Sequence, residues 1–114
     1  MSLQVRSESR DGAAVVSPTG EIDLSCSPEL RVALQQALLT KPGALLVDLS
    51  GVPSIDSSGV ATLIEAMRST QAQSIPLVLC GLVPRVMAVL EIARLDSVFQ
   101  IAPDVDEALK ATGA

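Results

Sequence analysis

Histidine, tryptophan and tyrosine are absent from this 114-residue sequence, and Phe99 is its only aromatic residue. Without histidine, the Ser-His-Asp and Cys-His nucleophile systems are excluded, together with most zinc sites. The core must therefore be aliphatic, and such side chains pack to normal interior density. With 48% hydrophobic and 18% charged residues, the composition is that of one globular domain.

Nucleotide-binding signatures are also missing. The sequence contains neither a Gly-x-x-x-x-Gly-Lys-Ser/Thr phosphate loop nor a Gly-x-Gly-x-x-Gly fingerprint. We place Asp48 inside an apolar strand and Asp56 in the loop after it, which disfavours paired acid–base chemistry. We therefore expect a protein that is not an enzyme, with no catalytic residue, no cofactor and no metal site.

Positive charge is scarce and scattered. Eight basic residues against thirteen acidic ones give a net charge of −5, which repels the phosphate backbone and argues against nucleic-acid binding. No apolar run approaches the roughly 20 residues that span a bilayer, and the N-terminus lacks the apolar region of a signal peptide. We expect a cytoplasmic protein without direct membrane insertion.

Cysteine is limited to Cys26 and Cys80, which lie far apart in the sequence beside apolar or small residues. Free cysteine is among the most buried residue types. We expect two reduced, mostly buried thiols rather than a disulfide or a metal site.

Apolar periodicity predicts a single α/β domain over residues 1–114, with the order β-β-α-β-α-β-α-β-α and about four helices. The Asp11-Gly12 turn signal predicts a hairpin at the start, and the later alternation predicts a mixed, mostly parallel sheet. We find no internal repeat, linker or low-complexity segment. Strands are expected at 3–7, 13–17, 44–49, 75–80 and 98–101, and helices at 27–40, 57–71, 84–94 and from 103 onward.

Two helix starts carry clear signals. Ser27 is predicted to cap the first helix, with Pro28 at its first helical position. Pro103 is predicted to open the last helix, with Asp104 and other acidic residues in its first turn, where they complement the helix dipole.

The segment 48–60, with the sequence Asp-Leu-Ser-Gly-Val-Pro-Ser-Ile-Asp-Ser-Ser-Gly-Val, lies between a buried strand and a helix. Functional loops gather beyond the carboxyl ends of strands in open α/β sheets. Asp56, Ser57 and Ser58 all suit a helix cap, and Gly59 lets another backbone or a bulky partner approach closely. One interpretation is a helix cap and nothing more. The other is a serine that is modified or contacted by a partner, since a helix start accommodates a phosphate.

Residues 47–63 resemble the signature of the STAS family, named for sulfate transporters and anti-sigma-factor antagonists. The Thr-Gly-Glu-Ile-Asp stretch at 19–23 resembles that family's loop before the first helix. Residues 79–82 and 89–96 also fit, so the resemblance covers essentially the whole chain as a single STAS domain.

Resemblance to the bacterial antagonist type implies that Ser57, directly after Asp56, is phosphorylated by an anti-sigma kinase that supplies the ATP. The unphosphorylated form would bind the anti-sigma factor, and a separate phosphatase would reset the switch. The implied partner-binding residues are Asp23, Asp56, Ser57, Ser58 and Gly59. The family also includes cytosolic subunits of bacterial ABC systems that transport phospholipids, so a transporter permease or ATPase is the alternative partner.

Overall fold

The computed structural model describes residues 3–112, and its helices and strands follow the predicted order. That prediction is confirmed. The elements are β1 (Gln4–Arg10), β2 (Ala13–Thr19), α1 (Ser27–Leu39), β3 (Ala44–Asp48), α2 (Ser57–Ala72), β4 (Leu77–Cys80), α3 (Pro84–Ile92), β5 (Gln100–Ala102) and α4 (Val105–Ala111).

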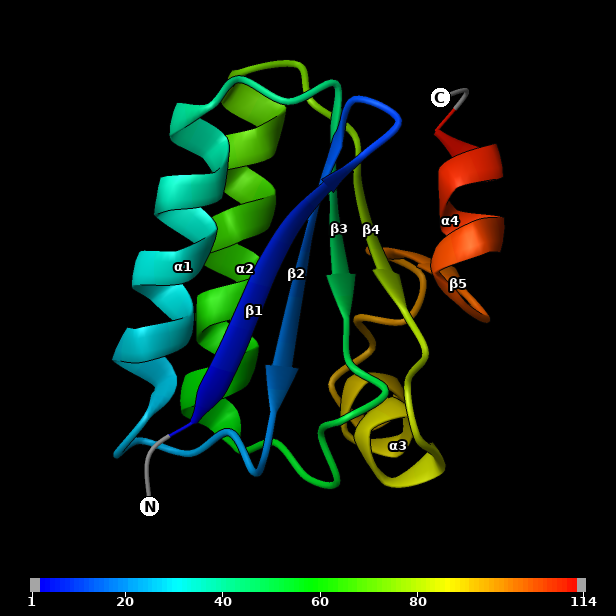
Figure 1. Cartoon of the computed structure of the whole chain (residues 1–114). Helices are drawn as coiled ribbons and strands as arrows, with labels where there is room; N and C mark the ends of the chain where they lie inside the picture. Colours follow the sequence, from blue (N-terminus) through cyan, green and yellow to red (C-terminus); the bar gives the residue numbers. More distant parts are fainter. Residues whose placement is uncertain (1–2, 113–114) are drawn as a thin grey trace.

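The five strands form one sheet in the order β1-β2-β3-β4-β5. β1 runs antiparallel to β2, whereas β2 to β5 are parallel, with Val16 opposite Val47 and Val47 opposite Leu79. The parallel strands therefore all end at one edge of the sheet, the lower edge in Figure 1. The loop after β3 and the first turn of α2 lie at this edge.

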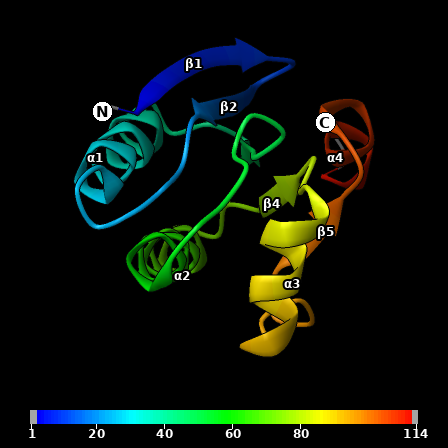
Figure 2. The ribbon, with the colours of Figure 1, turned by 90° about the horizontal axis from the view of Figure 1, so that it is seen from below.

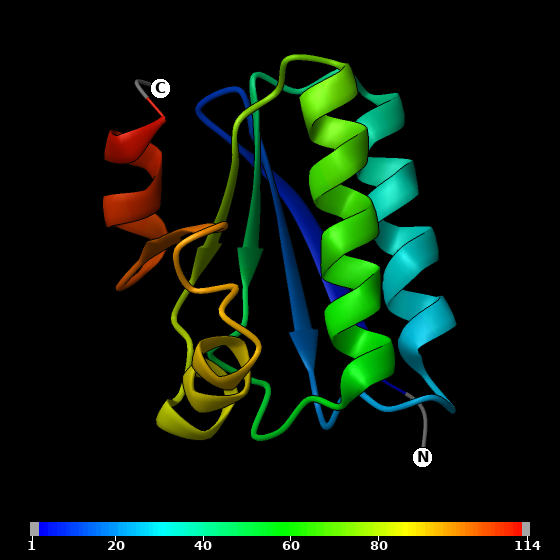
Figure 3. The ribbon, with the colours of Figure 1, turned by 180° about the vertical axis from the view of Figure 1, so that it is seen from behind.

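Helices cover both faces of the sheet. α1 and α2 lie side by side on one face, and α4 lies on the other (Figures 2 and 3). The larger core cluster fills the first face and includes Leu30, Leu63 and Leu79, while a smaller cluster between the sheet and α4 includes Leu46 and Val78. Residues 44–47 of β3 are at most 1% exposed because both faces of this central strand are covered.

Surface ion pairs connect neighbouring elements. Arg10 of the hairpin contacts Asp106 of α4, and Arg31 of α1 contacts Glu65 of α2, each at 3.0 Å. All four side chains are at least 40% exposed, so each pair contributes only about 0–1 kcal/mol. The burial of apolar side chains, and not these pairs, holds the layers together.

Two helix starts differ from prediction. α1 takes Cys26 as its N-cap residue, and Ser27 is the first helical residue, buried, with its N–H donating to the Asp23 carbonyl at 2.8 Å. The predicted cap by the Ser27 hydroxyl is therefore wrong: α1 has no side-chain cap and follows a backbone turn, in which the Asp23 carbonyl accepts from the Cys26 and Ser27 N–H groups. The last helix begins at Val105 because the Asp104 side chain accepts from the Glu107 N–H at 2.8 Å, which leaves Pro103 outside the helix.

Both cysteines are free and buried, as predicted. Burial is the main cause that raises the pKa of the Cys80 thiol to about 12, with smaller contributions from the charges of Asp48 and Asp104. Cys80 is therefore a neutral core side chain at physiological pH. Across residues 3–112, no helix is both long enough and apolar enough to cross a membrane.

Replacing Leu63 with alanine tests the core. Leu63 lies on α2 and is 0% exposed, so Leu63→Ala should lower the free energy of unfolding by about 2–5 kcal/mol. Leu39→Ala is the control, because Leu39 is 81% exposed and should change stability by less than about 0.5 kcal/mol. Urea denaturation followed by circular dichroism measures both; equal midpoints for the two variants would contradict the packing described above.

Candidate functional site

Two loops meet at the carboxyl edge of the parallel strands. The loop after β2 pairs with the loop after β3 through three backbone hydrogen bonds. The Gly20 N–H donates to the Gly51 carbonyl at 3.0 Å, the Ile22 N–H to the Ser54 carbonyl at 3.1 Å, and the Asp56 N–H back to the Ile22 carbonyl at 3.0 Å. An isolated parallel bridge pairs Ile22 with Ile55. The start of α2 is therefore fastened to the segment that leads into α1.

Asp56 is the N-cap of α2. Its backbone is extended, and its Oδ1 accepts from the Ser58 N–H at 2.9 Å, the Ser58 hydroxyl at 2.6 Å and the Gly59 N–H at 3.2 Å. The hydrogen bond from the Ser58 hydroxyl is the largest cause that lowers the pKa of this carboxyl. Desolvation raises the pKa by less, and the bonds from backbone N–H groups lower it further. Asp56 is therefore an exposed carboxylate at neutral pH.

The two adjacent serines have different environments. The Ser58 hydroxyl is held by Asp56, and Ser58 is half-buried. Ser57 is exposed, and within the described residues its hydroxyl has no hydrogen-bond partner. Of this pair, Ser57 is the hydroxyl available to an incoming reagent or partner.

Asp23 lies in the neighbouring loop. Its Oδ1 accepts from the Ser25 N–H at 2.9 Å and from the Ser25 hydroxyl at 2.5 Å. These bonds lower the pKa of Asp23, with the side-chain bond the larger cause, while the nearby charge of Asp56 acts in the opposite direction. The predicted site residues Asp23 and Asp56 are thus brought together as two ionised carboxylates.

Gly59 is buried directly beneath the loop pairing. A Cβ placed on it would lie 2.5 Å from Ile55 Cγ1 and 2.7 Å from Ile22 Cγ2. The close approach expected at this glycine is therefore made by the chain's own isoleucines. Gly59 thus allows the tight packing of Ile22 and Ile55 that shapes the turn. Its role in a partner contact stays a prediction.

The two loops repeat a short motif. Residues 22–25 read Ile-Asp-Leu-Ser and residues 55–58 read Ile-Asp-Ser-Ser, and in both the aspartate accepts from the N–H and hydroxyl of the serine two residues later. This likeness is confined to four residues and is not an internal repeat of a structural unit. In this alignment Leu24 occupies the position of Ser57, and its side chain is 76% exposed. The paired Ile-Asp-x-Ser stretches are the sequence signal that would have pointed to Leu24.

The surface around Ser57 is acidic. Glu21, Asp23 and Asp56 are all exposed there, and the three ion pairs among the described residues lie elsewhere: Arg10 with Asp106, Arg31 with Glu65, and Lys110 with Glu107. No basic side chain of the described chain forms an ion pair with Asp23 or Asp56. The turn therefore offers negative charge and one unengaged hydroxyl.

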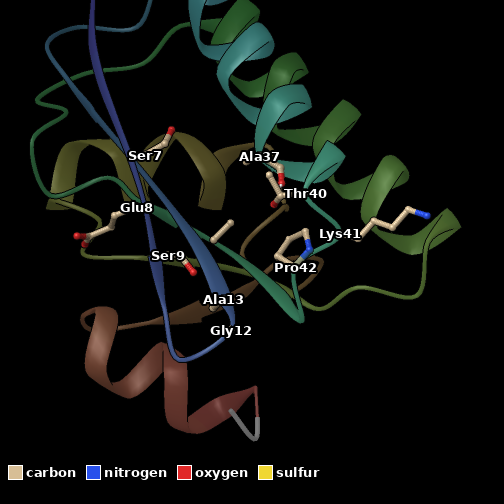
Figure 4. A pocket seen from close by; sticks show the side chains of 10 residues that line it. Ser7, Glu8, Ser9, Gly12, Ala13, Ala37, Thr40, Lys41 and Pro42 are labelled. Atoms are coloured by element: carbon tan, nitrogen blue, oxygen red, sulfur yellow. The ribbon is translucent and has the colours of Figure 1, made fainter.

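A surface cavity of about 420 Å³ lies at the other end of the sheet, between the β1–β2 hairpin and the end of α1 (Figure 4). Its lining is mostly small or polar residues, with Glu8 and Lys41 as its charged side chains. The cavity is remote from the serine turn and presents no group of reactive side chains.

The fold and this turn define an α/β domain that displays a single unengaged serine at the first turn of a helix. The chain belongs to the STAS domain family, whose pattern it matches over residues 4–108.

Similar proteins include several anti-sigma antagonists. The anti-sigma-B factor antagonist of Listeria monocytogenes is 28% identical over 102 residues, which cover 89% of this chain and 90% of that protein. The anti-sigma-F factor antagonist of Mycobacterium tuberculosis is 37% identical over 62 residues, 54% of this chain and 51% of that protein. The crystal structure of an anti-sigma factor antagonist from Mycobacterium paratuberculosis superposes with a TM-score of 0.90 at 28% identity, covering 98% of this chain and 95% of that one.

Removing the cap should weaken the fold in a pH-dependent way. Asp56→Ala should lower the free energy of unfolding by about 1 kcal/mol at pH 7, because the first N–H groups of α2 lose their acceptor. The pKa of Asp56 in the folded protein lies below 3.8, its value in the unfolded chain. The contribution of its charge is therefore complete above that value and is lost as the pH falls through the folded pKa.

Urea titrations at pH 7 and pH 3 measure this difference. Asp96→Ala is the control, because Asp96 is exposed and outside the turn. A difference between wild type and Asp56→Ala that grows on acidification would contradict the cap.

A methyl group at Gly59 should destabilise the loop pairing. Gly59→Ala forces Ile22 or Ile55 to move, at a cost of roughly 1–3 kcal/mol, which outweighs the gain of up to about 1 kcal/mol in helix propensity. Gly43→Ala is the control, because a Cβ there meets only the Gly12 carbonyl at 3.5 Å. If thermal melts ranked Gly59→Ala at or above wild type, the tight packing under the turn would be refuted.

Proposed function

We propose that this protein is an anti-sigma-factor antagonist whose binding to an anti-sigma factor is switched off by phosphorylation of Ser57. The observation that carries the proposal is the difference between the two serines: Ser57 is exposed and unengaged, whereas the Ser58 hydroxyl is bound to Asp56 at 2.6 Å. The names of the Listeria and mycobacterial relatives support the antagonist role. In this proposal the protein acts in the cytoplasm.

The anti-sigma partner is proposed to be a serine kinase that brings its own ATP, with a separate phosphatase that removes the phosphate. The chain then acts as a substrate and a binding partner, and supplies no catalytic residue. Asp23, Asp56 and Ser58 shape the surface that the partner recognises, while buried Gly59 acts through the loop geometry.

Electrostatics supports a switch at this position. A phosphate adds about −1.5 to −2 charges at neutral pH, beside the ionised Asp23 and Asp56. The dipole at the start of α2 favours such a group by about 0.3–1 kcal/mol, so the fold tolerates the modification. Within an interface the added charge must also be desolvated next to two carboxylates. A net loss of about 3 kcal/mol there weakens binding more than a hundredfold.

The fold itself does not depend on the Ser57 hydroxyl. Because the cap uses Asp56 and Ser58, changes at Ser57 act on recognition and leave stability nearly unchanged. This separation makes the serine testable by substitution.

The experiment is an affinity purification of the tagged protein from its native host, with mass spectrometry of the captured proteins. We expect a kinase-type anti-sigma factor. Ser57→Ala should retain it, whereas Ser57→Asp should weaken its binding at least about tenfold, since even one charge in a desolvated contact costs more than about 1.4 kcal/mol.

Ser74→Asp is the charge-matched control, because Ser74 is exposed at the far end of α2 and should bind like wild type. Equal binding by Ser57→Ala and Ser57→Asp would contradict the switch. Capture of an ABC permease and its ATPase, in place of an anti-sigma factor, would assign the protein to the transporter class.

A further inference from the structure

Leu24 is a large apolar side chain held in solvent beside the serine turn. It is 76% exposed, although the residues on either side of its loop, Ile22 and Cys26, are at most 2% exposed. Isolated surface leucines are common and need no explanation. Leu24 differs from such residues in two ways: its backbone is held by a hydrogen-bonded turn, and that turn is paired with the one that carries Ser57.

The backbone around Leu24 is fixed by local hydrogen bonds. The Asp23 side chain holds Ser25, and the Asp23 carbonyl accepts from the Cys26 N–H at 3.1 Å and the Ser27 N–H at 2.8 Å. Leu24 therefore cannot turn into its own core without breaking this turn. Because the backbone of this turn is already fixed, little backbone freedom is lost when a partner covers the Leu24 side chain, which favours binding.

Leu24 and Ser57 occupy matching positions in adjacent loops. The bridge between Ile22 and Ile55 aligns the two loops in parallel just before the two turns. Two residues further along each loop are Leu24 and Ser57. The Asp56 N–H donates to the Ile22 carbonyl at 3.0 Å, which places the two turns in direct proximity.

We propose that Leu24 is an apolar anchor that inserts into a pocket of the same anti-sigma kinase that phosphorylates Ser57. This inference rests on the proposed function and adds the contact that makes the partner specific. Leu24 is surrounded by three acidic side chains, those of Glu21, Asp23 and Asp56. A complementary partner therefore has an apolar pocket with basic residues at its rim. A second copy of this chain is disfavoured as the occupant, because it would bring the same carboxylates and a net charge of −5 against them.

The anchor also explains how one phosphate disrupts the complex. An apolar pocket closed over Leu24 excludes water from the adjacent Ser57. A phosphate on Ser57 must either lose its water or force the pocket open. Phosphorylation therefore weakens the apolar contact at Leu24 directly.

The test compares two leucines on one chain. Leu39 is 81% exposed and lies at the opposite end of α1, so Leu39→Ala removes the same atoms from an equally exposed site. The probe is the purified kinase captured by wild-type protein and shown to phosphorylate Ser57. Calorimetry gives its affinity for each unphosphorylated variant, and phosphate transfer at low substrate concentration gives kcat/KM.

Leu24→Ala should bind at least about tenfold more weakly than wild type, the loss typical of a buried anchor, with a matching fall in kcat/KM. Leu39→Ala should stay within twofold of wild type, and Leu24→Met should retain most of the affinity because its volume and apolar character are kept. Both alanine variants should have the same melting temperature as the wild-type protein.

One outcome would overturn the anchor while leaving the switch intact: the kinase binds the wild-type protein and phosphorylates Ser57, but Leu24→Ala and Leu39→Ala bind it with equal affinity. Loss of affinity by Leu24→Met as large as that by Leu24→Ala would also overturn an apolar pocket. If no kinase bound or labelled the wild-type protein, the proposed function would fail, and the anchor with it.

Discussion

The parallel bridge between Ile22 and Ile55 is the interaction on which the rest of this surface depends. It closes over Gly59, where a Cβ would lie 2.5 Å from Ile55. Through it, the loop before α1 and the loop before α2 become one unit at the carboxyl edge of the sheet. The bridge sets Asp23 near Asp56 and joins the turn that carries Leu24 to the turn that carries Ser57. Buried packing thus determines which exposed groups lie together.

Stability and recognition are assigned to different atoms of the turn. Asp56 and Ser58 satisfy the first N–H groups of α2, and aliphatic packing of α1 and α2 on the sheet holds the domain together. Ser57 contributes to neither. A charge added to Ser57 can therefore change what binds the turn without unfolding it, which is the physical requirement for a reversible switch.

The fold was largely predictable because its signals are local. Apolar runs and helical periodicity identified every strand and helix, and the buried run at β3 indicated a central strand covered on both faces. The differences lie at element ends: β1 and β5 are shifted from the predicted 3–7 and 98–101, and two helix starts differ as well. Asp104, and not Pro103, sets the start of α4, and α1 follows a backbone turn at Asp23 without a side-chain cap from Ser27.

The site was predictable in part. The motif around Asp56 and Ser57 is contiguous in sequence, so spacing and family resemblance both point to it. The likeness of the two Ile-Asp-x-Ser stretches was visible in the sequence, but their pairing was not, because it depends on a bridge between residues 33 positions apart, Ile22 and Ile55. The family resemblance distinguished Ser57 from Ser58, whereas the hydroxyl that the Asp56 carboxylate binds is visible only in the structure.

We propose that the unengaged hydroxyl of Ser57 is the phosphate acceptor. The most direct measurement is site-resolved mass spectrometry of the protein isolated from growing host cells, with fragmentation that separates modification at Ser57 from modification at Ser58. We expect phosphate on Ser57 with Ser58 unmodified. Phosphate on Ser58, or a chain without phosphate at either residue under all growth conditions, would contradict it.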